Sequence, residues 1–505
     1  MSPTSAATAP RAATPEHDDR AAWRALWALV LGFFMILVDA NIVQVAMPHI
    51  MRSLHADINE VIWVTSAYLL AYAVPLLITG RLGDRFGQKR MYVLGMGVFT
   101  LASLWCGLST SITMLILARA VQGLGAAMIS PQSMAVITRL FPPERRGAAM
   151  GLWGSVAGVA VLVGPILGGF LVDSVGWQWI FFVNVPVGVL GIVLALRLVP
   201  TLPTQAHAFD WPGVALSALG TFLLIFGIQE GESHDWGRIW GAVTIPMVIG
   251  AGLFVLAAFV LWQARNRREP LLPLSLFRDR NFSLANAAIT AVGFVVTCQG
   301  IPLYLYTQAA RGLSSTESAL LMVPLAVLSG VLAPLAGKHI QRRDPRPLAV
   351  GALVLFAIGT VLYSVLMRPS VPVPWLLVPS ALLGVASAGI WGPLSITATR
   401  NLPPRMAGAG AGVYNTTRQM GAVVGSAAIA AVIDWRLRQT MPGGGGGAAS
   451  GSTQMGGSTL PAAIVEPFSR AMSQAMLVPA VVVLIAAACA LFFEKPGERA
   501  RHARR

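Results

Sequence analysis

The chain consists of long apolar runs separated by short polar segments. An α-helix needs about 20 largely apolar residues to cross a lipid bilayer, and from residue 23 onward the apolar runs repeatedly reach that length. The runs lie near residues 25–47, 61–80, 91–109, 112–138, 147–171, 178–198, 212–229, 239–263, 283–307, 317–337, 347–366, 374–398, 406–432 and 471–493. The pattern predicts an all-α integral membrane protein with fourteen transmembrane helices.

The distribution of basic residues predicts how these helices are oriented. The 36 Lys and Arg against 21 Asp and Glu give a net charge of +15, which in a soluble protein would favour a nucleic-acid ligand. Here the Lys and Arg residues gather in alternate polar segments, beginning with the N-terminal one, as cytoplasmic loops do. We therefore expect both termini in the cytoplasm. The excess of Arg over Lys, with abundant Ala and Gly, is typical of GC-rich bacterial genomes and favours a bacterial inner (cytoplasmic) membrane.

An internal repeat divides the chain into two halves. The fourth and fifth runs resemble the twelfth and thirteenth at a constant offset, which pairs Gly123 with Gly384, Thr138 and Arg139 with Thr399 and Arg400, Pro142 and Pro143 with Pro403 and Pro404, and Gly147, Gly151 and Gly164 with Gly408, Gly412 and Gly425. Parallel halves of this kind occur in secondary transporters, with the substrate site between them.

The repeat and the span count together predict the organisation of the chain. The expected segments are a disordered cytoplasmic N-terminus (1–22), an N-terminal six-helix half (23–198), an inserted two-helix segment (199–270), a C-terminal six-helix half (271–495) with a flexible Gly-rich outer loop (440–459), and a basic cytoplasmic tail (496–505).

The chain lacks the usual signatures of enzymes and of ATP-driven pumps. Its three cysteines fall far apart inside apolar runs, and none of its seven histidines lies at ligand spacing from another, so neither a disulfide framework nor a metal site is expected. No phosphate-binding loop ending in Gly-Lys-Ser or Gly-Lys-Thr is present in the sequence. We expect no enzymatic activity, no metal and no cofactor. The expected partners are a small-molecule substrate, protons and the lipid bilayer, with no nucleic acid, and the protein should be a monomer.

Asp39 is the one acidic residue deep inside an apolar run. A carboxylate is expensive in hydrocarbon and by default marks a functional site. Arg119, in the fourth run, lies at comparable depth, so the two side chains can neutralise one another. We favour a proton-coupling role, in which protonation of Asp39 releases Arg119, over a static ion pair that only fixes helix register.

The polar segment after the second run carries a motif rich in glycine and charge. Its residues are Gly80, Gly83, Asp84, Arg85, Gly87, Lys89 and Arg90. Glycines permit a tight turn. One interpretation of the segment is an ordinary cytoplasmic loop without a specific role. The motif resembles the signature of the major facilitator superfamily at this location. The resemblance implies a conformational latch, in which Asp84 faces the N-terminal end of the thirteenth helix, where the helix dipole favours an anion. The corresponding segment of the second half, 337–344, is degenerate.

Motifs in other runs narrow the resemblance. Arg119, Gln122 and Gly123 resemble the family's Arg-x-x-Gln-Gly motif, which is associated with proton coupling. In the fifth run, small residues alone would serve helix packing, yet their pattern resembles the antiporter motif of exporters. The positions concerned are Gly158, Gly164, Pro165, Gly168 and Gly169.

Segments 38–48 and 177–186 are similar to those of the fourteen-helix drug:proton antiporters, except that Gln178 stands where that group usually has Arg. The resemblance extends from about residue 23 to residue 495. It implies a major facilitator fold with two six-helix halves and an inserted helix pair.

The expected function is proton-coupled export of lipophilic or amphipathic small molecules by alternating access. One alternative is a dedicated exporter of a single endogenous metabolite or lipid. Another is a membrane sensor that kept the fold and lost transport, but the presence of Asp39, Arg119 and Asp84 together counts against it, because only transport requires all three.

Polar side chains inside the apolar runs predict a substrate cavity between the halves. They are Asn41, Gln44, Gln122, Asn415, Arg418 and Gln419. Arg418 decides the chemistry of that cavity. As an exposed cation it would repel cationic drugs and attract anionic, zwitterionic or neutral ones. If a carboxylate neutralises it, the cavity becomes a largely apolar pocket suited to promiscuous ligands. In a third interpretation Arg418 only braces backbone carbonyls between helices.

Overall fold

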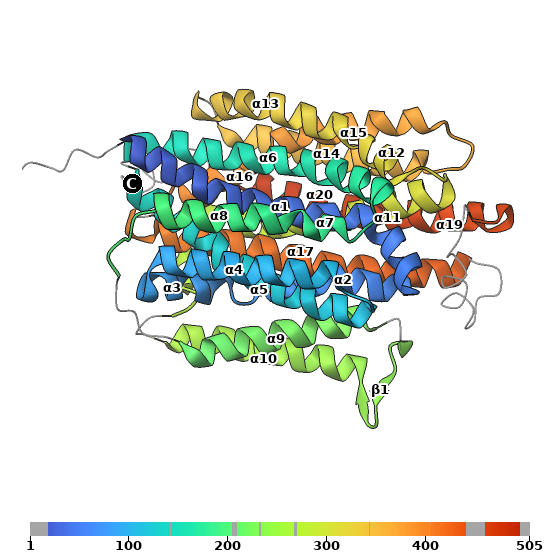
Figure 1. The fold of residues 1–505 in the computed structure, drawn as a ribbon, viewed down its shortest axis with the longest axis horizontal. Helices are drawn as coiled ribbons and strands as arrows, with labels where there is room; N and C mark the ends of the chain where they lie inside the picture. The colour runs from blue at the N-terminus through green and yellow to red at the C-terminus, as the bar shows by residue number, and fades with distance from the viewer. Residues whose placement is uncertain are drawn as a thin grey trace, which may run out of the picture.

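A computed structural model describes residues 19–141, 143–204, 210–231, 234–266, 270–342, 344–402, 404–440 and 460–494. The predicted N-terminal disorder up to residue 18, the Gly-rich segment from residue 441 and the basic tail lie outside the described residues. Figure 1 shows an elongated bundle in which nearly all helices run along the long axis.

The first part of the bundle contains α1 (Asp19–Leu54), α2 (Ile58–Ala73), α3 (Leu76–Phe86), α4 (Gln88–Gly107), α5 (Ile112–Leu140), α6 (Pro143–Ser174), α7 (Trp179–Phe182) and α8 (Asn184–Leu198). The inserted segment contains α9 (Trp211–Gln229), the antiparallel strands β1 (Arg238–Trp240) and β2 (Val243–Thr244), and α10 (Ile245–Arg265). We call the end of the bundle that carries β1 and β2 the hairpin end. The opposite end, where α1 begins and α20 finishes, is the terminus end (Figure 1).

The last part of the bundle begins with the 3-10 turn η2 (Leu274–Arg278), α11 (Arg280–Leu305), the π-helical turn η3 (Tyr306–Ala310), α12 (Ser315–Leu320) and α13 (Val323–Arg342). It continues with α14 (Pro345–Leu366), the 3-10 turn η4 (Val373–Leu376), α15 (Leu377–Ala388), α16 (Trp391–Thr399), α17 (Pro404–Thr440), α19 (Ala462–Ala475) and α20 (Leu477–Leu491).

By length and composition, 11 of the described helical segments can cross a membrane, or up to 12 if α2 and α3 form one bent span. The bend between α2 and α3 is 49° and coincides with Pro75, which removes a backbone donor and cannot continue a helix undisturbed. The all-α membrane architecture is thus confirmed, whereas the number fourteen is not established by this criterion. The two other predicted spans correspond to α4 and α6, which lie within the bundle (Figure 1).

Helices approach one another closely where glycine replaces a side chain. A Cβ atom on Gly123 in α5 would lie 2.3 Å from the backbone oxygen of Tyr68 in α2. A Cβ atom on Gly384 in α15 would lie 2.6 Å from the backbone oxygen of Leu325 in α13. These two glycines match in the internal repeat, and each lets the same kind of backbone contact form in its own half, as small residues do between membrane helices.

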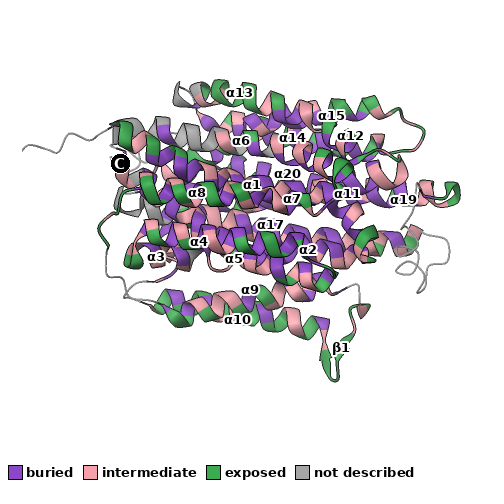
Figure 2. Ribbon diagram, in the orientation of Figure 1, coloured by how far each residue is buried: buried purple, intermediate pink, exposed green. Residues whose placement is uncertain are grey.

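The inserted helices α9 and α10 pack against each other along one side of the bundle (Figure 1). Many of their side chains are exposed (Figure 2), as expected of helices that face lipid on several sides. At the hairpin end, Trp63 of α2 donates a hydrogen bond from Nε1 to Oε1 of Glu230 (2.6 Å), which ties α9 to the first half.

At the terminus end, Asp210 joins the inserted pair to the connection with the second half. Its carboxylate accepts hydrogen bonds from the backbone of Gly213 and Leu271 and from the side chains of Trp262 and Gln263. Burial raises the pKa of Asp210, but these hydrogen bonds outweigh it and bring the pKa below its ordinary value. One carboxylate therefore fixes the start of α9, the end of α10 and the segment that leads to η2.

The two halves contact each other at the hairpin end through α6 and α12. The Oδ1 and Oδ2 atoms of Asp173 accept hydrogen bonds from the backbone N–H groups of Ser315 (3.2 Å) and Thr316 (2.8 Å), and Oδ2 also accepts one from the Thr316 hydroxyl (2.6 Å). A Cβ atom on Gly169 would lie 2.7 Å from Cα of Thr316. This contact therefore depends on a residue without a side chain at position 169.

A second set of contacts at the hairpin end comes from α1. Gln308 donates from Nε2 to the backbone oxygen of Val45 (3.0 Å), and His49 lies 3.3 Å from the Ser315 hydroxyl through Nδ1. Gln44 reaches Gly300 of α11 so closely that a Cβ atom there would lie 2.1 Å from its Oε1. We call the contacts made by α1 and α6 with η3, α11 and α12 the hairpin-end seal.

Gly169→Val should open the hairpin-end seal, because the added side chain collides with the backbone of α12. The measurement is the rate at which a membrane-impermeant maleimide labels the thiol introduced by Ser315→Cys, with the three native cysteines replaced by alanine. Ser315 is buried, so labelling should be slow in the parent protein and several-fold faster with Gly169→Val. Gly97→Val is the control, since a Cβ atom on Gly97 meets nothing within 4 Å. Equal labelling rates in all three proteins would contradict the proposed role of Gly169.

Candidate functional site

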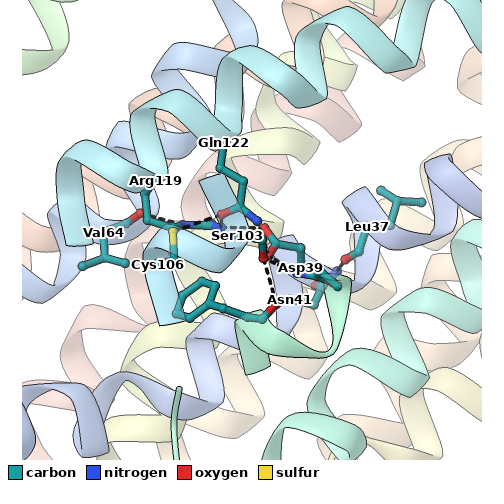
Figure 3. Close-up of polar contacts among 10 residues, drawn as sticks. Leu37, Asp39, Asn41, Val64, Ser103, Cys106, Arg119 and Gln122 are labelled. Carbon is teal, nitrogen blue, oxygen red and sulfur yellow. Dashed lines mark hydrogen bonds and ion pairs between the residues drawn. The ribbon is translucent and has the colours of Figure 1, made fainter. Parts of the chain in front are cut away.

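Asp39 and Arg119 form an ion pair in the interior of the first half. Nη1 of Arg119 in α5 lies 2.5 Å from Oδ2 of Asp39 in α1, and both side chains are completely buried. Figure 3 shows the two side chains directed toward each other between their helices. Because charges removed from water are tolerated only when they are paired and hydrogen-bonded, each of these residues depends on the other.

The second oxygen of Asp39 is occupied as well. Oδ1 accepts hydrogen bonds from Nε2 of Gln122 and Nδ2 of Asn184, both at 2.9 Å. Asn184 also donates to the Ser103 hydroxyl (3.0 Å), which donates to the backbone oxygen of Phe181. The carboxylate therefore faces three donors, and a proton on Oδ1, which already accepts two hydrogen bonds, would displace one of them. We call Asp39, Ser103, Arg119, Gln122 and Asn184 the buried cluster.

The guanidinium of Arg119 has a less complete set of partners. Nη1 also donates to Oε1 of Gln122 (2.7 Å), and Nε donates to the backbone oxygen of Val64 (3.3 Å). The guanidinium lies over the ring of Tyr68, 4.0 Å from its centroid, a favourable cation–π arrangement. Nη2 has no hydrogen-bond partner among the described residues. If Asp39 lost its charge, Arg119 would be a buried cation with few acceptors, and it would have to move.

Sequence reasoning did not identify all members of the buried cluster. Asn184 and Ser103 were not among the candidates, and Gln122 was expected to face the central space, whereas it is completely buried against Asp39. The available signal for Asn184 was a carboxamide between two valines inside the apolar run 178–198. Which helix face carries it toward Asp39 depends on the packing of α8 against α1 and α4.

The other predicted cavity residues lie on α1 and α17. Asn41 donates to the backbone oxygen of Leu37 in its own helix (2.6 Å; Figure 3), and Gln44 contributes to the hairpin-end seal. Asn415, Arg418 and Gln419 lie on α17; Asn415 and Arg418 are partly exposed, and Gln419 is nearly buried. The six residues expected to line one cavity therefore lie in at least three different places, which are the buried cluster, the hairpin-end seal and the middle of α17.

The glycine- and charge-rich motif forms α3 and the turn into α4. Gly87 has a φ of +97°, which favours glycine, and a Cβ atom on Gly83 would lie 1.8 Å from Oε1 of Gln132 and would displace that side chain. Gly80 lies closest to Pro131 of α5. Arg85 lies over the ring of Phe86, Lys89 donates to the backbone oxygen of Leu196, and Arg90 is exposed.

Asp84 is paired within its own half. Its Oδ1 accepts hydrogen bonds from Nη2 of Arg139 and from Nε2 of Gln88, both at 2.9 Å. Arg139 also donates to the backbone oxygen of Pro203 (3.1 Å), at the start of the connection to α9. The side chains of the first turn of α17 lie outside the described residues, so the contact expected between Asp84 and that helix end stays a prediction.

Two glycines of the candidate antiporter motif, Gly164 and Gly168, lie on the face of α6 that packs against α1. Cβ atoms on Gly164 and Gly168 would lie 3.1 Å from Cβ of Asn41 and 2.6 Å from Cγ1 of Ile42. Pro165 lies between them within α6, and Gly169 faces α12 in the hairpin-end seal. Gly158 belongs to the part of α6 whose surroundings are not described. The motif therefore brings α6 against the turn of α1 that follows Asp39.

No group of three or more His, Cys, Asp or Glu residues that could hold a metal ion occurs within the described ranges. Asp39 is the one acidic member of the buried cluster, and Arg119 is its one basic member.

Comparisons with known proteins match this architecture. A family model described as Major Facilitator Superfamily matches residues 29–426. An uncharacterized MFS-type transporter of Mycobacterium tuberculosis is 51% identical over 487 residues, which cover 96% of this chain and 83% of that protein. The tetracenomycin C resistance and export protein of Streptomyces glaucescens is 31% identical over 509 residues, covering 95% and 93%. A probable multidrug resistance protein of Escherichia coli is 30% identical, covering 83% and 81%.

A solved structure shares the fold. It is the crystal structure of a bacterial homolog of the human lysosomal transporter Spinster in an inward-facing, unoccupied conformation. The TM-score is 0.63 at 18% sequence identity, and the match covers 94% of this chain and 97% of that one.

Asp39→Ala should destabilise the protein strongly, because it leaves Arg119 buried without its counter-ion; removal of one partner from a buried pair costs about 3–5 kcal/mol. Adding Arg119→Leu should restore much of the loss, since an apolar replacement removes the unpaired charge. Thermal unfolding in detergent of the two single variants and the double variant measures this coupling. If the double variant were as unstable as the sum of the single variants, the two side chains would not be energetically paired.

Proposed function

Because this chain belongs to the major facilitator superfamily and to its drug:proton antiporter family, we propose that it is a proton-coupled exporter of lipophilic or amphipathic small molecules. In this proposal the two halves expose a central substrate site alternately to either side of the membrane. The observation that carries the proposal is the buried cluster around Asp39, which holds one titratable carboxylate in the interior of the first half.

The names of the relatives support export as the direction of transport. One is a resistance and export protein for tetracenomycin C, one is a probable actinorhodin transporter, and others are multidrug resistance proteins. These names include both single compounds and multidrug resistance. The alternative of a dedicated exporter for one metabolite or lipid is therefore supported alongside multidrug export, and a panel of dyes and antibiotics distinguishes them.

We propose that the chain crosses a bacterial inner membrane fourteen times, with α4 and α6 added to the apolar spans and with both termini in the cytoplasm. The alternation of basic segments supports this topology. The terminus end is then cytoplasmic, and the hairpin-end seal closes the outer side. This arrangement corresponds to an inward-facing state.

The position of α1 suggests how a proton could open the seal. Asp39 lies on the same helix as Gln44, Val45 and His49, which contact the second half within one to three turns of it. Protonation of Asp39 removes the charge that holds Arg119, so that α1 and α5 lose their strongest contact. Because Gly164 and Gly168 fit α6 against α1, a shift of α1 would be passed to α6 and its contact with α12.

The proton gradient would supply the energy, and no cofactor is proposed. One proton moving through 100 mV releases about 2.3 kcal/mol, and each 1.4 kcal/mol corresponds to about a tenfold concentration ratio. A transport-inactive sensor is the least supported alternative, because nothing in a sensor requires Asp39, Arg119 and Asp84 together. We propose that the protein acts as a monomer on its substrate and protons.

Asp39→Asn should abolish export driven by a pH gradient and leave substrate binding partly intact. The amide keeps the size of the side chain but cannot take up a proton. The assay is dye transport by purified protein in proteoliposomes with an imposed pH gradient, together with dye binding in detergent without a gradient. Asp57→Asn is the control, since Asp57 only caps α2 and asparagine caps equally well. Full gradient-driven transport by Asp39→Asn would refute the assignment.

Asp84→Asn should slow the transport of every substrate by a similar factor, because the latch acts on conformational cycling and lies far from the middle of the bundle. Arg139→Gln should have the same effect, since it removes the partner of Asp84. The double variant should be no slower than either single variant, as expected when two residues act through one interaction. Loss of one drug with retention of another would contradict the idea.

A further inference from the structure

Arg418 is a cation midway along α17 that no described carboxylate neutralises. Its electrostatic neighbours are Tyr414, one turn away on the same helix, and Tyr72 on α2 of the first half. Its side chain keeps part of its surface exposed, although it lies in the interior third of the helix sequence. α17 packs against α2 of the first half, and the Ser426 hydroxyl of α17 lies 2.6 Å from the Ser66 hydroxyl of α2. This part of α17 therefore lies where the two halves face each other.

Of the three interpretations of Arg418, the described contacts support the exposed cation. Both oxygens of Asp39 are occupied by the buried cluster, so Asp39 does not neutralise Arg418. The acidic residues whose surroundings are not described belong to the chain termini, to loops or to the first turn of α6. Within the described ranges, the Arg418 side chain makes no hydrogen bond to a backbone carbonyl, which leaves the bracing role unsupported.

An unneutralised cation at this depth needs compensation. An arginine at the centre of a membrane costs about 2.5–3.5 kcal/mol even on the lowest scale. Tyr414 is a second polar group that lacks a partner within the described ranges. It is 8% exposed, and its hydroxyl has no hydrogen-bond partner among the described residues. A guanidinium beside a free hydroxyl is suited to an oxyanion, which accepts charge-assisted hydrogen bonds from both.

We propose that Arg418 and the Tyr414 hydroxyl bind the anionic group of the substrate, so that the exporter takes amphipathic acids such as carboxylates. The inference rests on the proposed function and specifies its substrate class. Tyr72 on the opposite half closes the site from the other side, so a bound acid contacts both halves.

The anion site is connected to the buried cluster through α2. The rings of Tyr68 and Tyr72 lie one turn apart, with centroids 6.1 Å from each other, and Tyr68 lies under the guanidinium of Arg119. In this proposal, movement of Arg119 on protonation of Asp39 reaches the anion site through the rings of Tyr68 and Tyr72, which are in tilted contact. Exchange of one monoanion outward for one proton inward moves two charges, so an inside-negative potential should accelerate transport of an acid.

The test uses two substrates that differ in one charge: a xanthene dye with a free carboxylate and the ethyl ester of the same dye. Purified protein in proteoliposomes transports each dye under a pH gradient, with and without an inside-negative potential. Arg418→Gln should reduce carboxylate transport by about tenfold or more, equivalent to about 1.4 kcal/mol, and leave ester transport close to that of the parent protein. Arg418→Lys should retain most carboxylate transport. The potential should accelerate the carboxylate more than the ester, because exchange for one proton moves two charges with the carboxylate and one with the ester.

Arg436→Gln is the matched control, because Arg436 lies on the same helix and stacks on its neighbour Trp435. It should not change the preference between the two dyes. Equal loss of both dyes in Arg418→Gln, equal behaviour of the Gln and Lys variants, or transport of the ester alone by the parent protein would overturn the proposal.

A binding measurement separates this proposal from the proposed function. Fluorescence polarisation of each dye with the detergent-solubilised protein needs no gradient. Arg418-dependent binding of the carboxylate without any gradient-driven transport would refute proton-coupled export and uphold the anion site. Gradient-driven export of both dyes that is indifferent to Arg418 would refute the anion site and uphold the exporter.

Discussion

The fold of the first half depends on the need to keep Asp39 and Arg119 together in a place that water does not reach. Removing two charges from water costs several kcal/mol each, and only close pairing with further hydrogen bonds recovers that cost. Gln122 of α5 and Asn184 of α8 supply those bonds, and Ser103 of α4 holds Asn184 by accepting a hydrogen bond from it. Four helices thus meet around one carboxylate, so a change in its charge would alter the contacts of all four.

That constraint acts on the second half through helices that take part in both regions. α1 carries Asp39 and also the residues of the hairpin-end seal, while α6 is fitted against α1 by Gly164 and Gly168 and against α12 by Gly169. Glycine makes these approaches close enough that small displacements cannot be absorbed by side-chain rotation. A rigid connection of this kind links the proposed proton site at Asp39 to the hairpin-end seal without requiring the substrate to touch either.

Sequence patterns predicted the elements better than their contacts. Apolar runs located the helices because crossing a membrane demands length and apolarity, and Asp39 and Arg119 were paired because few other charges lie at that depth. The direction of Gln122, the contribution of Asn184 and the pairing of Asp84 with Arg139 were not predicted. A run that is apolar all round carries no periodicity to mark its inward face, so these contacts are fixed only by helix packing. The role of Asp173 as a cap on α12 was missed for the same reason.

The two deep arginines differ in their surroundings, and the difference separates two tasks. Arg119 has its counter-ion within its own half, so in the proposed mechanism protonation of Asp39 changes the packing of α1 against α5. Arg418 has no counter-ion among the described residues and lies toward the other half, so it is available to a ligand. If the carboxylate that takes up the proton also lined the substrate site, it would repel an acidic substrate whenever it was ionised. In the proposed mechanism the proton and the acid bind at separate sites, joined through Tyr68 and Tyr72, which removes this conflict and lets binding of either one influence the other.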